Sequence, residues 1–174
     1  MLVFIVGYRG VGKTTVGTTL AQMLAVPFYD VDKMVEECAR KTISEIVAQD
    51  GWKAFREQEK EIIKKVSRQS EGVVSTGGGA ITDEENIKCI KTAGAVVWLK
   101  ADITTIVTRI KNDVTSVSGR PSLSNDDLYA ETGKLLTQRE PIYQSIAEIT
   151  VTTVDKNITT IVEEIYKQIS LLSS

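Results

Sequence analysis

The chain has 174 residues, 42% of them hydrophobic and 25% charged, which suits a single globular domain with a sizeable core. Its formal net charge of −2 gives no electrostatic footprint for nucleic acid or for an anionic membrane. The chain has no histidine and only two cysteines, which excludes a Ser-His-Asp or Cys-His nucleophile, a histidine general base and a disulfide framework.

The N-terminal residues predict a buried strand, a glycine-rich turn and a helix, in that order. Apolar and β-prone residues 2–6 stop at Gly7, and residues 7–14 read GYRGVGKT, which fits G-x-x-x-x-G-K-[ST]. In such a loop the backbone N–H groups converge on phosphate oxygens at the positive end of the helix dipole. We expect Lys13 to contact the β- and γ-phosphates and the Thr14 hydroxyl to bind Mg²⁺. The predicted nucleotide site comprises Gly10, Val11, Gly12, Lys13, Thr14 and Thr15.

Helical and strand patterns alternate along the rest of the chain and predict a parallel sheet covered by helices on both faces. Capping boxes at Thr42–Glu45 and Thr82–Glu85 predict two helix starts, and Asp50-Gly51 predicts a break. A helix over residues 126–140 is expected to end before Pro141. We find no internal repeat or interdomain linker, so residues 1–174 are expected to form one domain. Further strands are expected at residues 28–30, 73–75, 95–99 and 149–151.

Two carboxylates follow the second expected strand, in the sequence FYDVD at residues 28–32. Asp30 and Asp32 are two residues apart, so on a strand they would project to the same side. They would lie at the carboxyl edge of the sheet, where open α/β proteins bind ligands. One could hold Mg²⁺ through water and the other could accept a hydrogen bond from an attacking hydroxyl. The alternative is that Asp32 only caps a helix.

A triple glycine at residues 77–79 follows the strand at 73–75 and would let the backbone approach a ligand closely. The alternative is a tight turn. The strand leads into Ser75 and Thr76 and lacks the carboxylate of an ordinary Walker B strand. We therefore expect a metal ion to depend on Thr14, Asp30 and water.

Two arginines are candidates for binding an anion, because a guanidinium can bind a carboxylate with two hydrogen bonds. Arg56 precedes Glu59 by three residues on an expected helix, so a pair between these two side chains is the alternative. Arg139 precedes Glu140-Pro141, at the expected end of its helix. Both side chains are candidate clamps for a carboxylate.

The segment from Asn112 to Asn125 is rich in Ser, Thr and Asn and has no apolar periodicity. A loop of this length in a compact domain is usually functional or disordered. We interpret it as a mobile lid over the nucleotide, at about residues 111–125, that carries Arg120. A disordered surface loop is the alternative.

Six motifs, in their order along the chain, resemble those of the shikimate kinase family. They are G-x-x-G-x-G-K-T at 7–14, F-x-D-x-D at 28–32, F-R-x-x-E at 55–59, the triple glycine at 77–79, R-P at 120–121 and R-x-P-x-Y at 139–143. The resemblance implies a three-layer α/β P-loop kinase fold of the nucleoside-monophosphate-kinase type. Its five-stranded parallel sheet would have the order 2-3-1-4-5, with helices on both faces.

The resemblance also implies a reaction, in which ATP phosphorylates the 3-hydroxyl of shikimate in the route to chorismate and aromatic amino acids. The shikimate-binding region would lie at about residues 32–60. Asp32, Lys13 and Arg120 would be the catalytic residues, with Asp32 as base and Arg120 reaching the transferring phosphate. Arg109 resembles the arginine that lies on the adenine ring. The residues that would hold shikimate are Asp32, Arg56, Gly77, Gly78, Gly79 and Arg139.

A second basic contact to adenine, common in the family, is poorly matched after the last strand, at residues 152–156. No run of 18 apolar residues is found, and the first strand is too short for a signal peptide and has no basic segment before it. We expect a cytoplasmic monomer that binds neither nucleic acid nor membrane.

Another small-molecule kinase, a nucleotide-binding regulator and a GTPase are the alternatives to a shikimate kinase. A gluconate kinase or adenylate kinase would use the same scaffold, but the spacing of F-x-D-x-D, F-R-x-x-E and the triple glycine argues against both. A nucleotide-binding regulator without catalysis would be expected to lack Asp32, Arg120 or Arg139, and all three are present. A GTPase is disfavoured because the chain has no N-K-x-D guanine motif.

Overall fold

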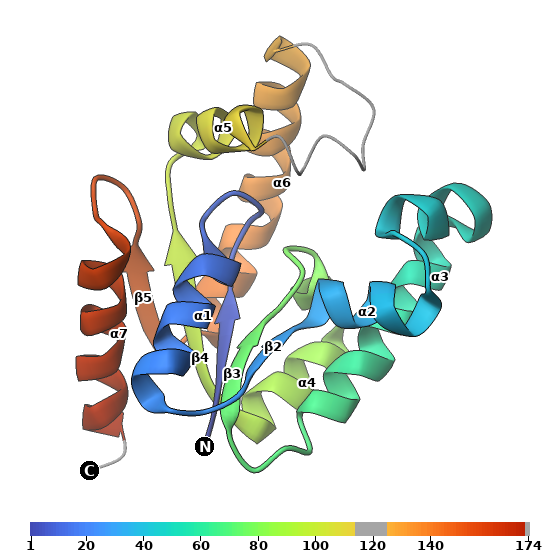
Figure 1. Cartoon of the computed structure of the whole chain (residues 1–174). Coiled ribbons are helices and arrows are strands. Elements are labelled where there is room, and N and C mark those ends of the chain that lie inside the picture. Colours follow the sequence, from blue (N-terminus) through green and yellow to red (C-terminus); the bar gives the residue numbers. More distant parts are fainter. Residues whose placement is uncertain (114–124, 173–174) are drawn as a thin grey trace.

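The computed structural model describes residues 1–113 and 125–172, and Figure 1 shows their arrangement. Its strands are β1 (Leu2–Val6), β2 (Phe28–Asp30), β3 (Gly72–Ser75), β4 (Gly94–Lys100) and β5 (Ile149–Thr152). Its helices are α1 (Lys13–Leu24), α2 (Val31–Ala39), α3 (Ile43–Val66), the 3₁₀ helix η1 (Ala80–Thr82), α4 (Glu84–Ala93), α5 (Ile103–Asn112), α6 (Asn125–Ile146) and α7 (Ile158–Leu172).

The five strands pair in parallel in the order β2-β3-β1-β4-β5, which confirms the predicted fold. In the register of the central strand β1, Leu2 lies opposite both Gly72 and Gly94. Every residue of β1 is buried, because helices cover both faces of a sheet that parallel crossovers connect. Burial on both faces explains why the apolar run at residues 2–6 is not interrupted by polar residues.

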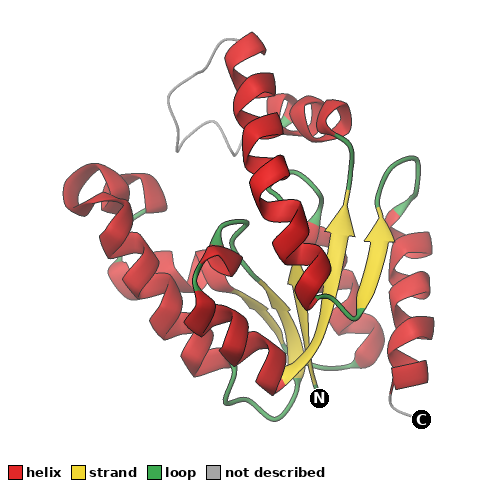
Figure 2. Ribbon diagram, turned by 180° about the vertical axis from the view of Figure 1, so that it is seen from behind, coloured by secondary structure: helices red, strands yellow, loops and turns green. Residues whose placement is uncertain are grey.

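Two hydrophobic layers lie on the two faces of the sheet. Val3 and Ile5 of β1 belong to the layer that contains α1 and α7, whereas Phe4 and Val6 belong to the layer that contains α3 and α4. Successive side chains of a strand point to opposite faces, so one strand supplies both layers. Figure 2 shows the second face, with α6 crossing it. None of the helices that the structure describes is long and apolar enough to cross a membrane.

Three segments meet at the carboxyl edge of the sheet, the upper edge in Figure 1. The phosphate loop at residues 7–12 follows β1, α2 follows β2, and the triple glycine follows β3. Because all the strands are parallel, their carboxyl ends lie on one side and bring these three segments together.

Two of the predicted helix boundaries are confirmed. The capping box of α3 is present, with the Thr42 hydroxyl accepting from the Glu45 N–H and the Glu45 carboxylate accepting from the Thr42 N–H at 2.7 Å. The expected break is also present, since the backbone at Gly51 is not helical and α3 is kinked there.

Two other helix boundaries were predicted wrongly. The cap of α4 is Asp83, whose carboxylate accepts from the N–H groups of Glu85 and Asn86, because η1 ends at Thr82 and the Thr82 hydroxyl donates to the Gly79 carbonyl instead. Helix α6 continues through Pro141 to Ile146 and does not end at residue 140. Proline removes one backbone donor but does not end a helix that tertiary packing supports, and Tyr143 and Ile146 are buried in the core.

Candidate active site

The phosphate loop leads directly into the first turn of α1. Gly12 caps this helix with φ at 96°, a left-handed conformation that glycine adopts without steric cost. Among the described residues no side chain caps the helix, so the first N–H groups of α1 remain available to an anion at the positive end of the helix. This geometry fits the predicted binding of phosphate by residues 10–15.

Lys13 lies in the first turn of α1, and its Nζ donates to the Tyr8 carbonyl oxygen at 3.0 Å. Burial lowers the pKa of its ammonium group to about 8, because water no longer solvates the charge. Asp32 and Asp30 oppose this shift through their negative charges. The loop thus holds a cation that an added phosphate would stabilise.

Thr14 and Asp30 are in contact, with the Thr14 hydroxyl donating to the Asp30 carboxylate at 2.9 Å. Oxygen atoms of this kind are the ligands that Mg²⁺ prefers. Within residues 1–113 and 125–172, no group of three or more His, Cys, Asp or Glu side chains could hold a metal ion. A Mg²⁺ ion at Thr14 and Asp30 would therefore take its other ligands from water and phosphate.

Asp30 and Asp32 do not share a strand, which corrects the sequence-based geometry. Asp30 ends β2 and caps α2 by accepting from the Lys33 N–H at 3.3 Å, whereas Asp32 lies in the first turn of α2. The alternative that Asp32 is the helix cap is also wrong. Burial raises the pKa of the Asp32 carboxyl, and the positive charges of Lys13 and Arg56 counteract that rise. The first turn of α2 thus brings Asp32 close to Lys13.

A cavity of about 120 Å³ lies beside the phosphate loop and brings together the predicted acceptor residues. Its polar lining includes Asp32, Arg56, Glu59, Arg139 and the three glycines at 77–79. Its apolar lining comes partly from Trp52 and Phe55 of α3. The cavity therefore offers two guanidinium groups, a carboxylate and an apolar wall to a small ligand.

Two of the three glycines leave space for charged side chains of α3. A Cβ atom on Gly77 would collide with the Glu59 carboxylate, and one on Gly79 would collide with the Arg56 guanidinium. The missing side chains at residues 77 and 79 therefore leave the space that Glu59 and Arg56 occupy.

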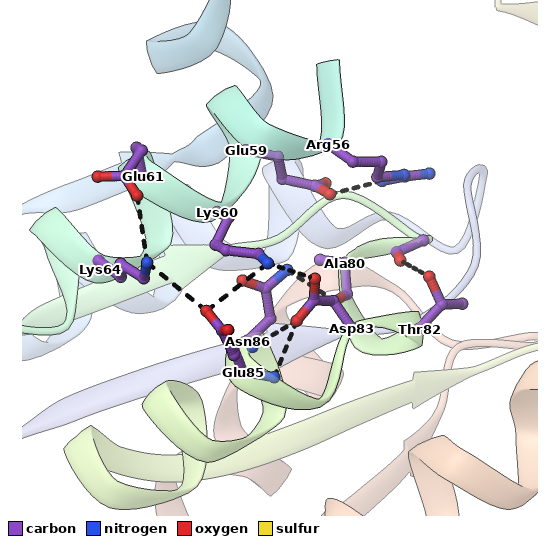
Figure 3. A network of polar contacts seen from close by, with 11 residues as sticks. Arg56, Glu59, Lys60, Glu61, Lys64, Ala80, Thr82, Asp83, Glu85 and Asn86 are labelled. Atoms are coloured by element: carbon purple, nitrogen blue, oxygen red, sulfur yellow. Dashed lines mark hydrogen bonds and ion pairs between the residues drawn. The ribbon is translucent and has the colours of Figure 1, made fainter. Parts of the chain in front are cut away.

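Arg56 and Glu59 form the ion pair that the sequence analysis gave as the alternative, with 2.5 Å between Nη1 and Oε2 (Figure 3). The Glu59 side chain is fully buried, but 30% of the Arg56 side chain is exposed and it lines the cavity. The pair therefore orients Arg56 and leaves part of its guanidinium to a ligand. Lys60, one residue further on α3, pairs with Asp83 at the start of α4 at 2.9 Å. Figure 3 shows this network joining α3 to Asp83 and Glu85 at the start of α4.

Arg139 comes from α6, on the other side of the triple glycine. Its Nη1 donates to the Gly78 carbonyl oxygen at 3.2 Å, and its guanidinium lies 5.7 Å from the centre of the Tyr8 ring. Tyr143, one helical turn later, donates to the same carbonyl at 2.6 Å. The role of Tyr143 in fixing Gly78 was not predicted, although the R-x-P-x-Y motif contains it.

Arg109 at the end of α5 lies beside the phosphate loop, as a contact to the nucleotide base requires. Its guanidinium donates to the Thr153 hydroxyl at 2.9 Å, to the Thr153 carbonyl at 2.8 Å and to the Val11 carbonyl at 3.5 Å. The Lys156 ammonium pairs with Glu164 instead. Arg120 and residues 114–124 of the expected lid lie outside the described residues.

Nucleotide binding is expected to weaken as the pH rises above about 8, because Lys13 then loses its proton in the free protein. The phosphates raise the pKa of Lys13 again, so binding takes up a proton in this range. Calorimetry of ADP binding in buffers with different ionisation enthalpies measures that uptake. The variant K13M should show no such uptake above pH 8, and an equal uptake in both proteins would contradict the assignment.

The comparisons with known proteins agree with this geometry. The family model described as "Shikimate kinase" matches residues 9–170. A shikimate kinase from Rhodopirellula baltica is 36% identical over 164 residues, which are 94% of this chain and 88% of that protein. One from Syntrophus aciditrophicus is 38% identical over 174 residues, covering 95% of this chain and 89% of that protein.

A solved structure with the same fold is that of shikimate kinase from Acinetobacter baumannii in complex with shikimate. It superimposes with a TM-score of 0.89 and 31% identity, over 98% of this chain and 93% of that chain. These matches support the family predicted from the six motifs over the gluconate kinase and regulator alternatives. The chain belongs to the shikimate kinase family.

Proposed function

We propose that the chain transfers the γ-phosphoryl group of ATP to the 3-hydroxyl of shikimate, giving shikimate 3-phosphate and ADP. The observation that carries this proposal is the position of Asp32, which lines the cavity together with Arg56 and Arg139 and interacts electrostatically with Lys13. The A. baumannii relative was solved with shikimate bound, and family membership extends the same substrate to this chain.

In the donor half of the site, the phosphate loop and the N-terminus of α1 would hold the β- and γ-phosphates of ATP. Thr14 and Asp30 would hold Mg²⁺, which neutralises phosphate charge when it is bound. Lys13 would stabilise the negative charge that develops on the transferring group. Arg109, fixed by Thr153 beside the loop, would contact the adenine.

In the acceptor half, Arg56 and Arg139 would bind the carboxylate of shikimate and so orient the ring. The Asp32 carboxylate would accept the proton of the 3-hydroxyl as its oxygen forms a bond to the γ-phosphorus. The bond from that phosphorus to the bridging oxygen breaks, and ADP leaves with the electron pair. The glycines at 77–79 let the backbone approach the substrate.

Further assignments follow from this function. Arg120 would reach the transferring phosphate from a lid at about residues 111–125, and residues 32–60 would form the shikimate-binding region of one domain. We propose a cytoplasmic monomer without nucleic-acid or membrane partners, which size-exclusion chromatography and cell fractionation would test.

The function is tested by measuring which acceptor molecule makes the chain release ADP from ATP. With ATP and Mg²⁺, ADP should appear when shikimate is added and should not appear with gluconate or AMP. Equal release with either alternative acceptor, or none with shikimate, would reject the proposal.

Replacing Gly79 by alanine should lower kcat/KM for shikimate by about 100-fold, because the new Cβ displaces the Arg56 guanidinium from the cavity. The control is Gly133→Ala on α6, where a Cβ would lie 3.5 Å from the nearest atom, an ordinary contact. Steady-state kinetics of both variants measure the effect. Similar values of kcat/KM for G79A and G133A would contradict the proposed carboxylate site.

A further inference from the structure

Unpaired polar atoms concentrate in the acceptor cavity. Among the described residues, six buried side-chain N or O atoms have no hydrogen-bond partner. Three of the six belong to residues that line this cavity: Tyr8 Oη, Arg9 Nε and Glu59 Oε1. Buried polar groups in proteins are nearly always hydrogen-bonded, so these atoms indicate groups that a ligand completes.

Two of these three residues have other contacts that explain their positions. The Tyr8 ring lies beneath Arg139, and the Glu59 carboxylate accepts from Arg56 through its other oxygen. Arg9 differs, because in the described part of the chain no hydrogen bond or ion pair of its side chain accounts for its place in the cavity wall. A guanidinium can neither lose its proton nor accept a hydrogen bond, so it can be satisfied only by an acceptor.

The position of Arg9 connects the two halves of the site. It is the second variable residue of the phosphate loop, in which phosphate is bound by backbone N–H groups, Lys13 and Thr14. Its own backbone nitrogen would lie 3.3 Å from a Cβ placed on Gly78, so the loop rests directly against the triple glycine. The nucleotide-binding pattern makes no demand on the side chain at this position, which therefore remains free to contact the acceptor.

We propose that Arg9 is a specificity-determining residue for the acceptor, whose buried Nε–H donates to a ring hydroxyl that is not phosphorylated. The inference rests on the proposed function, in which Arg56 and Arg139 bind the carboxylate and Asp32 faces the 3-hydroxyl. The 4- and 5-hydroxyls are then the remaining oxygen acceptors on shikimate. A hydroxyl can donate to a carboxylate or carbonyl while it accepts from Arg9, so such a contact leaves no polar group unpaired.

The test compares R9M and R9K with the parent enzyme on shikimate, 4-deoxyshikimate and 5-deoxyshikimate. We expect R9M to raise KM for shikimate about tenfold and to leave kcat and the Kd of ADP within about twofold, since one hydrogen bond in a closed site is lost. With one of the two deoxy analogues, R9M and the parent should have nearly equal KM values. R9K should keep the defect, because its ammonium lacks a donor at the Nε position.

Two results would overturn the proposal: a full tenfold defect of R9M with both analogues, or parent-like KM of R9K with shikimate. The matched control is R68M, at an exposed arginine beyond the end of α3, which should match the parent throughout. Thermal unfolding and ADP binding report whether R9M folds, and R9Q replaces it if it does not. The parent enzyme's own shikimate-dependent ADP release reports separately on the proposed function.

Discussion

Replacing Asp32 by asparagine is expected to lower kcat by about 10²–10⁴ and to leave ADP binding within about twofold of the parent value. Asparagine fills the same space beside Lys13 but cannot accept the proton of the attacking hydroxyl. Burial raises the pKa of the Asp32 carboxyl in the parent protein, which makes this carboxylate a better proton acceptor than an exposed aspartate. Single-turnover kinetics at saturating ATP and shikimate separate this chemical step from binding.

The pH profile provides a second measurement on the same residue. The base must be ionised, so kcat/KM for shikimate should fall as the pH drops through the raised pKa of Asp32. The midpoint of this fall, the acid limb of the pH profile, should lie above the usual pKa range of aspartate. The residual activity of D32N should not show this fall. The control D50N changes an exposed carboxylate that pairs with Lys41. An unchanged kcat in D32N would exclude Asp32 as the base.

Replacing Lys13 by methionine is expected to lower kcat by about 10²–10³, the typical cost of removing one preorganised electrostatic group from a transition state. The same change removes the positive charge that holds down the pKa of Asp32. The acid limb of the pH profile should therefore move to higher pH. An unshifted limb in K13M would contradict the coupling between these two side chains.

The stability of K13M gives a readout that is independent of turnover. Lys13 has a pKa of about 8 when folded and 10.5 as its ordinary value, so the unfolded chain binds more protons between these values. The folded parent protein should therefore gain stability as the pH rises from about 8 to 10.5, and K13M should lack this gain. Urea unfolding across this range measures the difference.

The fold and most of the site were predictable because they depend on local sequence patterns. The apolar run at residues 2–6, the phosphate loop and the alternation of helices and strands are all local signals, and the sheet order followed from the family motifs. Arg56 and Arg139 were predicted as a clamp, and the structure brings both to one cavity.

The errors concern positions where tertiary structure decides. Asp32 was placed on a strand by its spacing from Asp30, but the strand ends at residue 30 and a helix begins at once. Pro141 was expected to end α6, yet packing of Tyr143 and Ile146 extends that helix.

Which distant residues contact one another could not be predicted from the sequence, even where a motif contains one of the partners. The hydrogen bonds of Arg109 to Thr153 join residues 44 positions apart, and those of Arg139 and Tyr143 to Gly78 span still longer separations. The cavity position of Arg9 also depends on a loop and a strand end that meet only in the folded sheet. Such positions could be predicted only from pairs that vary together among related sequences.

The central claim is direct phosphoryl transfer to one hydroxyl of shikimate, and the position of phosphate in the product tests it most directly. Phosphorus–proton correlation spectroscopy on the product of ATP, Mg²⁺ and shikimate identifies the ring proton coupled to phosphorus. We predict coupling to the proton on carbon 3, with one ADP formed per phosphorylated ring. Coupling to another ring proton, or ADP formation without a phosphorylated ring, would contradict the assignment of the reaction to this site.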